Sequence, residues 1–361
     1  MKNKGWANTK TLSGIACCSV IVVLTLAIFC AYAYIGWPII GPIIRGAIYY
    51  REIERAYPGE CMDFEGTGSS PGGAAISPDN QLVAVGINDE TLVWRIEDGE
   101  LVTVMKTERG SLTCLEFSSD GRLLMRGCPG IYPDKHLVQI WDTSSWERIM
   151  TLVHQRTDDA AFSPDGSLLA TGTQKALFLW QVNDGALLRI FEPGAYIIRF
   201  SPDGTKMAGA SWIEYDDHKL FLWNMQGDIL WETKGPESTI GDIGFSNDGQ
   251  TLTLVTRRDG ELQRYDATTG TLLETHQLPV RDDVRAATIS PNGELVALSY
   301  DEREVEELFR ISDQSLIASL TGGESNILEF SRDSELLVTQ DDYDIQVCTV
   351  PEELYYNANE E

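Results

Sequence analysis

The chain has 361 residues, of which 28 are basic and 55 acidic, so its formal net charge at pH 7 is −27. The first 45 residues contain four basic residues and no acidic one, which leaves 24 basic against 55 acidic residues, a net charge of −31, in the remainder. Binding to nucleic acid depends on Lys and Arg side chains that neutralise phosphates. The composition therefore excludes nucleic acid from the expected partners.

The N-terminal region is built around one long apolar segment. No charged residue occurs between Lys10 and Arg45. Within this stretch, residues 13–37 are long enough to cross the hydrocarbon core of a bilayer, which needs roughly 20 apolar residues. We therefore predict a short N-terminal tail over 1–12, a transmembrane signal anchor over 13–37 and a juxtamembrane segment over 38–58.

A cleaved signal peptide is the alternative for this region, because basic residues precede the apolar run and Ala31-Tyr32-Ala33 resembles a cleavage site. The apolar stretch exceeds the roughly 7 to 15 residues of a signal-peptide core, which favours the anchor. Both interpretations export the rest of the chain, although basic residues flank the segment equally on its two sides and do not fix the orientation. We expect a single-pass membrane protein whose main domain lies outside the cytoplasm.

Beyond residue 58, a Ser-Pro-Asp-Gly signature recurs in variant copies. Successive copies begin 41, 45, 38, 45, 44 and 41 residues apart. This is the period expected when four short strands and their turns form one propeller blade. The seven copies begin at Ser77, Ser118, Ser163, Ser201, Ser246, Ser290 and Ser331. We predict an all-β fold: a seven-bladed β-propeller of four-stranded blades over residues 59–352, followed by an acidic C-terminal tail over 353–361.

Each repeat has the same local pattern. The proline of the signature presets φ at the first corner of a turn, and Asp and Gly tolerate the sharper conformations at the next positions, so the signature closes a hairpin. A third strand then ends on a large side chain, which is aromatic in six of the seven repeats. These residues are Trp94, Trp141, Trp180, Trp223, Tyr265, Phe309 and Cys348. One sheet cannot bury both of its faces, so neighbouring blades must supply the core.

These repeats resemble the WD40 β-propeller family. The copies FSPDGSLLATGT and FSPDGTKMAGAS, with Leu-Trp at 179–180 and 222–223 further along, match its strand and turn pattern. Only Trp141-Asp142 keeps the Trp-Asp pair and no Gly-His dipeptide occurs, so the chain looks like a divergent, bacterial-type member. A TolB-like propeller also carries such turns and is the second resemblance, but its third strand usually lacks the Leu-Trp ending.

The resemblance also implies how the ring closes. The last repeat has no convincing fourth strand after Thr349, because Pro351 and the polar tail fit a strand poorly. In this family the missing strand is often supplied from the other end of the domain. Residues 59–66 are the candidate, and they would remove an exposed sheet edge.

This arrangement implies two candidate disulfides. Cys61 and Cys348 would lie on adjacent strands of the closing blade, and Cys114 and Cys128 lie on adjacent strands of one hairpin. Counting back from the turn at 118–121 places Cys114 nearer to Arg126 than to Cys128, which weakens the second pair. An oxidising compartment would permit both bonds, and unpaired buried thiols are the alternative.

Acidic residues gather in loops that the family's topology places on one face, namely the second-to-third-strand loops and the inter-blade loops. We therefore expect one strongly negative rim and regard it as the candidate partner-binding surface. Its acidic members are Glu214, Asp216, Asp217, Asp301, Glu302, Asp341, Asp342 and Asp344. Aromatic neighbours that could contribute are Trp212, Tyr215 and Tyr343.

The sequence lacks the His-Glu-x-x-His, Gly-Lys-Ser/Thr and Cys-x-x-Cys motifs, and its Gly-rich segment at 66–73 opens no helix. We expect no catalytic site, no cofactor and no resident metal. The leading hypothesis is a monomeric, membrane-anchored interaction or scaffold module whose acidic rim binds a protein or peptide, which its charge predicts to be basic. One alternative is an extracytoplasmic sensor of a small molecule or of a divalent cation such as Ca²⁺, which prefers carboxylate oxygens. Another is a TolB-like propeller of an envelope assembly.

Overall fold

The structure, a computed structural model, describes residues 61–64, 71–106, 114–127, 137–153, 157–214, 217–280, 282–301, 305–321, 325–341 and 344–351. The chain divides into two units, Met1–Ala56 and Tyr57–Glu361, and every described residue belongs to the second. The predicted anchor over 13–37, the juxtamembrane segment and the acidic tail thus lie outside the described residues. In the part that is described, no helix has the length and apolarity needed to span a membrane.

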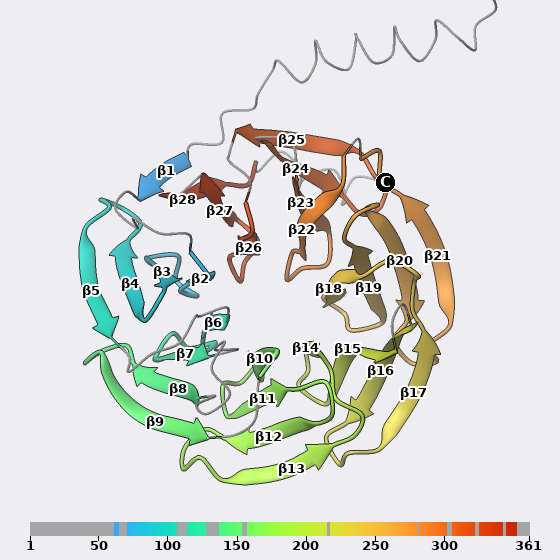
Figure 1. Cartoon of the computed structure of the whole chain (residues 1–361), viewed down its shortest axis with the longest axis horizontal. Coiled ribbons are helices and arrows are strands. Elements are labelled where there is room, and N and C mark those ends of the chain that lie inside the picture. The colour runs from blue at the N-terminus through green and yellow to red at the C-terminus, as the bar shows by residue number, and fades with distance from the viewer. Residues whose placement is uncertain are drawn as a thin grey trace, which may run out of the picture. The chain divides into compact units, whose positions relative to one another are not determined.

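Seven four-stranded antiparallel sheets, here called blades 1 to 7, are arranged in a ring (Figure 1). In blades 1 to 6 the strands run in chain order from the inside of the ring outwards. Blade 1 contains β2 (Gly73–Ile76), β3 (Leu82–Ile87), β4 (Glu90–Arg95) and β5 (Leu101–Lys106). Blade 2 contains β6 (Cys114–Phe117), β7 (Leu123–Gly127), β8 (Leu137–Asp142) and β9 (Glu147–Val153). Blade 3 contains β10 (Asp159–Phe162), β11 (Leu168–Gly172), β12 (Leu177–Gln181) and β13 (Leu187–Phe191).

The other half of the ring repeats this order. Blade 4 contains β14 (Ile197–Phe200), β15 (Lys206–Glu214), β16 (Asp217–Asn224) and β17 (Ile229–Lys234). Blade 5 contains β18 (Ile240–Phe245), β19 (Thr251–Thr256), β20 (Glu261–Asp266) and β21 (Leu272–Gln277). Blade 6 contains β22 (Val284–Ile289), β23 (Leu295–Tyr300), β24 (Val305–Arg310) and β25 (Leu316–Thr321). The predicted all-β propeller of seven four-stranded blades is therefore confirmed.

Blade 7 is assembled from both ends of the domain. Its inner three strands are β26 (Glu329–Phe330), β27 (Leu336–Asp341) and β28 (Asp344–Thr349), and its outer strand is β1 (Cys61–Phe64). In the antiparallel register Cys61 lies opposite Cys348, and a disulfide joins the two residues. The expected closure of the ring by the segment around residues 59–66 is thus present over the described residues Cys61–Phe64.

The signature turns owe their shape to a repeated set of hydrogen bonds. In blade 3, the hydroxyl of Ser163 donates to Oδ1 of Asp165 at 2.6 Å and accepts the backbone N–H of Leu168 at 2.9 Å. Gly166 then takes a φ of +70°, which glycine adopts without strain. Because the serine closes the hairpin on the residue five positions later, the turn fixes the register of the first two strands.

This closure corrects one expectation. In blade 2 the N–H of Leu123 donates to Oγ of Ser118, so Phe117 lies opposite Leu124 and Cys114 lies opposite Gly127, not Arg126. Gly127 stands midway in the sequence between positions 126 and 128, so the register does not favour Arg126 as was expected. Cys128 itself lies outside the described residues, so the proposed Cys114–Cys128 bond stays a prediction.

The hydrophobic core is divided into seams between neighbouring blades. The seam between blades 2 and 3, for example, packs Met125 and Ile140 against Phe162 and Leu169, all at most 6% exposed. Packing between blades therefore supplies the core that one sheet lacks, as the repeat pattern predicts.

Candidate functional site

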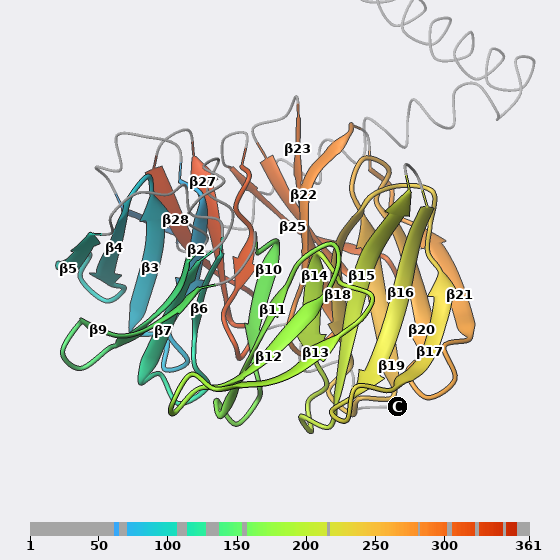
Figure 2. The same cartoon turned by 60° about the horizontal axis from the view of Figure 1, so that its bottom comes forward.

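The two ends of the ring are built from different connections (Figure 2). The signature end carries the signature turns and the turns between third and fourth strands. The hairpin end carries the hairpins between second and third strands and the connections between blades. Every predicted partner-binding residue falls in a second-to-third-strand hairpin of blade 4, 6 or 7, and so at the hairpin end.

The hairpin of β15 and β16 is the longest of these, with strands of nine and eight residues. Trp212 lies opposite His218 in its register. The indole of Trp212 is 45% exposed, and its ring centroid lies 4.8 Å from that of Tyr196 and 6.1 Å from that of His218. The hydroxyl of Tyr196 lies 3.3 Å from Nδ1 of His218. The exposed indole thus packs against the rings of Tyr196 and His218.

The acidic residues of the hairpin end are only partly described. Glu214 and Asp217 form the last register pair of the β15–β16 hairpin, and Asp341 and Asp344 form that of β27–β28. Asp301, directly after β23, is exposed and accepts a hydrogen bond from Nε of Arg285 at 2.8 Å. The predicted residues Tyr215, Asp216, Glu302, Asp342 and Tyr343 lie outside the described residues.

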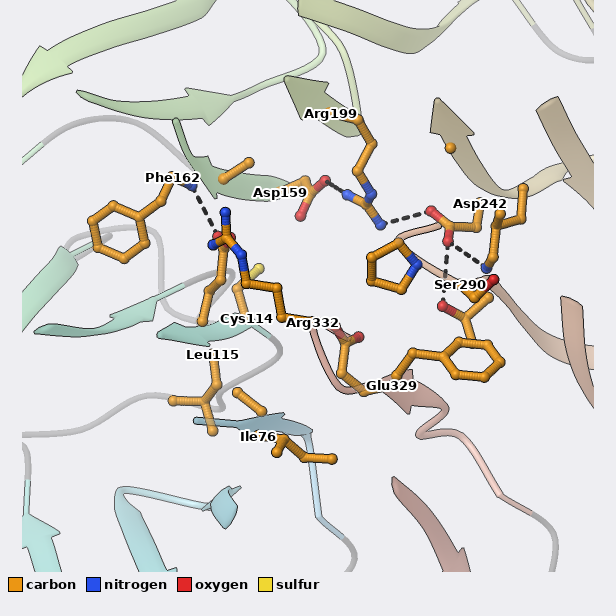
Figure 3. Close-up of a pocket in the computed structure, with 18 of the residues that line it drawn as sticks. Ile76, Cys114, Leu115, Asp159, Phe162, Arg199, Asp242, Ser290, Glu329 and Arg332 are labelled. Carbon is orange, nitrogen blue, oxygen red and sulfur yellow. Dashed lines mark hydrogen bonds and ion pairs between the residues drawn. The ribbon is translucent and has the colours of Figure 1, made fainter. Parts of the chain in front are cut away.

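A cavity of about 560 Å³ occupies the centre of the ring (Figure 3). The inner strands of all seven blades contribute residues to its wall. Six charged side chains line it: Glu116, Asp159, Arg199, Asp242, Glu329 and Arg332.

Arg199 of β14 joins three blades in this wall. Its Nη1 lies 3.1 Å from Oδ2 of Asp159 in blade 3, and its Nη2 lies 2.6 Å from Oδ1 of Asp242 in blade 5. Burial by itself would lower the pKa of Arg199, but the two carboxylates outweigh it and raise that pKa. Each carboxylate also accepts a backbone N–H from the next blade, that of Ile198 for Asp159 and that of Ile289 for Asp242. These bonds tie blades 3 to 6 together around the cavity.

Two further carboxylates face the cavity without an ion pair among the described residues. Glu116 accepts the N–H of Phe162 at 2.9 Å, and Glu329 makes no hydrogen bond within the described part of the chain. Enclosure in the ring raises the pKa of each to about 8, although the Glu329 side chain is open to the cavity. Both groups therefore carry a proton for much of the time at neutral pH.

Arg332 lies at the signature end of the cavity. It takes the place that proline holds in four of the seven signatures, and its Nη2 donates to the carbonyl oxygen of Pro164 at 3.3 Å. The bond links the turn of blade 7 to the turn of blade 3, on the far side of the ring. The side chain thus spans the cavity at this end.

Sequence reasoning missed these cavity residues, although the signature marks several of them. The residue two positions before each signature serine belongs to the inner strand at one common level. In chain order these are Ala75, Glu116, Ala161, Arg199, Gly244, Thr288 and Glu329. Charge at three of seven equivalent positions would have identified the wall. Among the described residues, no group of three or more His, Cys, Asp and Glu side chains is arranged to bind a metal ion.

Comparison with known proteins places the repeats in a family. Residues 146–181 match the family model described as "WD domain, G-beta repeat". An uncharacterized WD repeat-containing protein from Deinococcus radiodurans is 32% identical over 219 residues, which cover 50% of this chain and 79% of that protein. The chain belongs to the WD40 repeat family. This membership decides between the two resemblances, WD40-like and TolB-like.

More distant relatives share only part of their length with this WD40 protein. The p21-activated protein kinase-interacting protein 1-like of Gallus gallus is 28% identical over 202 residues, covering 53% of this chain and 50% of that protein. The angio-associated migratory cell protein of Homo sapiens is 26% identical over 205 residues, covering 54% and 45%. The matched part of the chain spans about half the length of these relatives.

A solved structure agrees with the fold. The β-propeller domain of Myceliophteria thermophila Cps50 (Swd1) superposes with a TM-score of 0.68 at 15% identity, covering 81% of this chain and 100% of that one. At this identity the likeness shows the architecture alone.

Proposed function

We propose that this WD40 protein is a membrane-tethered interaction module that binds a basic protein or peptide with its hairpin end. Propellers of the family typically serve as protein-binding platforms, and the Gallus gallus relative is named for its interaction with a kinase. The observation that carries the proposal is the β15–β16 hairpin, the longest at this end, where the half-exposed Trp212 precedes the acidic register pair of Glu214 and Asp217. Exposed tryptophans that pack into a partner are frequent energetic centres of protein interfaces.

Charge would act mainly on the rate of encounter. The chain beyond residue 45 carries a net charge of −31, and complementary charges steer association within a Debye length of about 8 Å at physiological salt. A single exposed ion pair contributes about 0 to 1 kcal/mol. Recognition of a basic partner must therefore come from the group of acidic hairpins rather than from one of them.

The site of action that we propose is an oxidising compartment outside the cytoplasm, with the segment 13–37 as the anchor. Support comes from the disulfide between Cys61 and Cys348, because such bonds persist in secreted and periplasmic proteins and are rare in the cytosol. A reporter enzyme active only outside the cytoplasm, fused after Glu361, should be active. Activity of a cytoplasm-only reporter at the same position would reverse the orientation, and a mature N-terminus at Tyr34 would replace the anchor by a signal peptide.

The binding proposal is tested by affinity capture from membranes of the native cell. Replacing Glu214, Asp217, Asp301, Asp341 and Asp344 together by Gln or Asn should abolish capture of the partner at low salt without lowering the melting temperature. The control neutralises four acids at the signature end, namely Glu97, Asp98, Glu100 and Asp184. Asp98 and Glu100 bind Arg95 at 2.7 and 2.6 Å on the surface, so the control removes charge without touching the core.

A second function is favoured by the central cavity. Its volume of about 560 Å³ falls in the roughly 300–1,000 Å³ range of small-molecule sites, and its wall presents carboxylates with unused acceptor capacity. In that case the protein is a sensor of a small polar ligand. Native mass spectrometry of the purified chain would show a bound mass that Glu116→Gln with Glu329→Gln abolishes, and a ligand-free wild type would remove this alternative.

A further inference from the structure

A charged side chain is buried in the seam between blades 1 and 2. Arg126 of β7 is 1% exposed and shares a face of the sheet with Leu124, which packs against blade 1. Its Nη1 reaches the carbonyl oxygen of Met105 in blade 1 at 3.3 Å. The corresponding positions of the other six blades carry Val85, Thr171, Gly209, Leu254, Leu298 and Thr339. The charge is therefore peculiar to blade 2.

In blade 3 the residue at the position equivalent to Arg126 accepts a hydrogen bond from the neighbouring tryptophan. Trp180 lies opposite Leu169, and its Nε1 donates to Oγ1 of Thr171 at 2.9 Å. In blade 2, Trp141 lies opposite Leu124, and the residue two positions further on is Arg126. By the same backbone register, the position whose side chain accepts the indole N–H in blade 3 carries a donor, Arg126, in blade 2.

The donors in this seam are not satisfied by the described residues. Nε and Nη2 of Arg126 and Nε1 of Trp141, which is 8% exposed, find no hydrogen-bond partner there. Oε1 of the cross-strand neighbour Gln139 also lacks one, but a neutral amide oxygen brings no counter-charge for the guanidinium.

Among the described residues, the charge of Arg126 also has no counter-charge in direct contact. Burial lowers its pKa to about 10, so the guanidinium remains protonated at neutral pH. Asp89 and Glu90 act on it only through space: Asp89 is exposed, and Glu90 is bound by Lys106 at 2.6 Å. A buried ion without a contacting counter-charge is strongly unfavourable.

We propose that a small monovalent anion, with chloride as the probe, binds in this seam between the guanidinium of Arg126 and the indole N–H of Trp141. The anion supplies the acceptor that Thr171 provides in blade 3 and the counter-charge that blade 2 lacks. It joins blades 1 and 2, because the guanidinium spans from β7 to the backbone of β5.

Blade 4 separates the effect of charge from that of an unsatisfied indole. There Trp223 packs over Gly209, and its Nε1 also lacks a partner in the described part of the chain, but the seam is neutral. Anion dependence should therefore depend on Arg126 and not on an indole N–H as such.

The test uses the full chain in detergent, melted at constant ionic strength while chloride or bromide replaces the larger anion isethionate. Wild type should melt roughly 2 °C higher when chloride is at ten times its dissociation constant. Arg126→Thr restores the arrangement of blade 3 and should fold, yet lose this dependence. Thr171→Val is the matched control in blade 3 and should keep the wild-type response.

Crystals grown in bromide provide the second measurement. The proposal requires an anomalous peak within hydrogen-bonding reach of both Arg126 and Trp141. A water at that position, or equal melting temperatures of wild type in chloride and isethionate, would overturn it. If Arg126→Thr fails to fold, crystals of Arg126→Met grown in bromide replace it. These crystals should lack the anomalous peak that the wild type shows.

Discussion

The signature end and the hairpin end of the propeller use acidic residues for different purposes. At the signature end, an aspartate recurs at one position of the signature turn in six of the seven blades, with Asn292 in its place in blade 6. The Ser163 hydroxyl and the N–H of Ser167, for example, hold the pKa of Asp165 below its ordinary value. At the hairpin end the hairpins differ in length, and their acids form no repeat. The difference teaches that the signature aspartates are part of the turns that shape the fold, whereas the acids of the hairpin end have no such repeated role among the described residues.

The largest effect should come from breaking the ring, on which both ends depend. Deleting Cys61–Phe64 exposes the edge of β28 and removes the disulfide to Cys348, which by itself contributes about 2 to 4 kcal/mol. The deletion should lower the melting temperature more than Cys61→Ser with Cys348→Ser does. Scanning calorimetry of the three proteins checks the order. A deletion variant with the same melting temperature as the wild type would show that β1 does not close the ring.

A smaller effect should separate the two ends directly. Ser163→Ala removes a buried hydroxyl that makes two turn hydrogen bonds, and it should lower the free energy of unfolding by about 1 to 3 kcal/mol. Asp301→Asn at the hairpin end should change it by less than about 0.5 kcal/mol, as surface substitutions usually do. Urea denaturation measures both. Equal losses would mean that the hairpin end is as much a part of the fold as the signature turns.

Much of the fold could be predicted from sequence because the signature carries its own geometry. A serine that bonds the residue five positions on, with glycine at positive φ, defines a hairpin wherever it occurs. Where glycine is missing, Asn80 and Ser334 adopt the same positive φ, so even divergent copies keep the turn. Counting such turns was enough to predict the number of blades.

The cavity could not be predicted in the same way. Arg199 contacts Asp159 and Asp242, which come 40 residues earlier and 43 residues later in the chain. Only the curvature of the ring brings these residues together, and no local motif records it. In the sequence, Arg332 is only a residue that replaces the proline of the signature. Its hydrogen bond to the carbonyl oxygen of Pro164 exists because the closed ring brings the two turns within reach of each other. The acidic rim was predicted from the positions of its residues in the loops. Such positions assign the residues to one end of the ring, but they do not predict which side chains the residues contact.

The cavity and the signature turns should also differ, by a smaller effect, in how pH changes their contributions to stability. Its carboxyl Glu329 has a pKa raised from 4.5 to about 8 by enclosure, so the folded protein retains a proton that the unfolded chain has lost between these values. The contribution of Glu329 to stability should therefore fall as pH rises from 4.5 to 8. Asp165 behaves in the opposite way, because its contribution to stability is lost as pH falls below its ordinary pKa of 3.8. Glu329→Gln should raise the melting temperature at pH 8 relative to wild type and leave it unchanged at about pH 4, below the ordinary pKa of the group. An equal shift at both values would contradict the raised pKa.

The central claim, that the hairpin end binds a basic partner, is tested most directly by association kinetics. The identified partner would be passed over the full chain at several salt concentrations, for wild type, for the variant neutralised at the hairpin end and for the control neutralised at the signature end. Loss of charge at the hairpin end should slow association at low salt and flatten its salt dependence, while the control keeps the wild-type salt dependence. If both variants associate as the wild type does, the acidic hairpins only solvate the protein and the partner binds elsewhere.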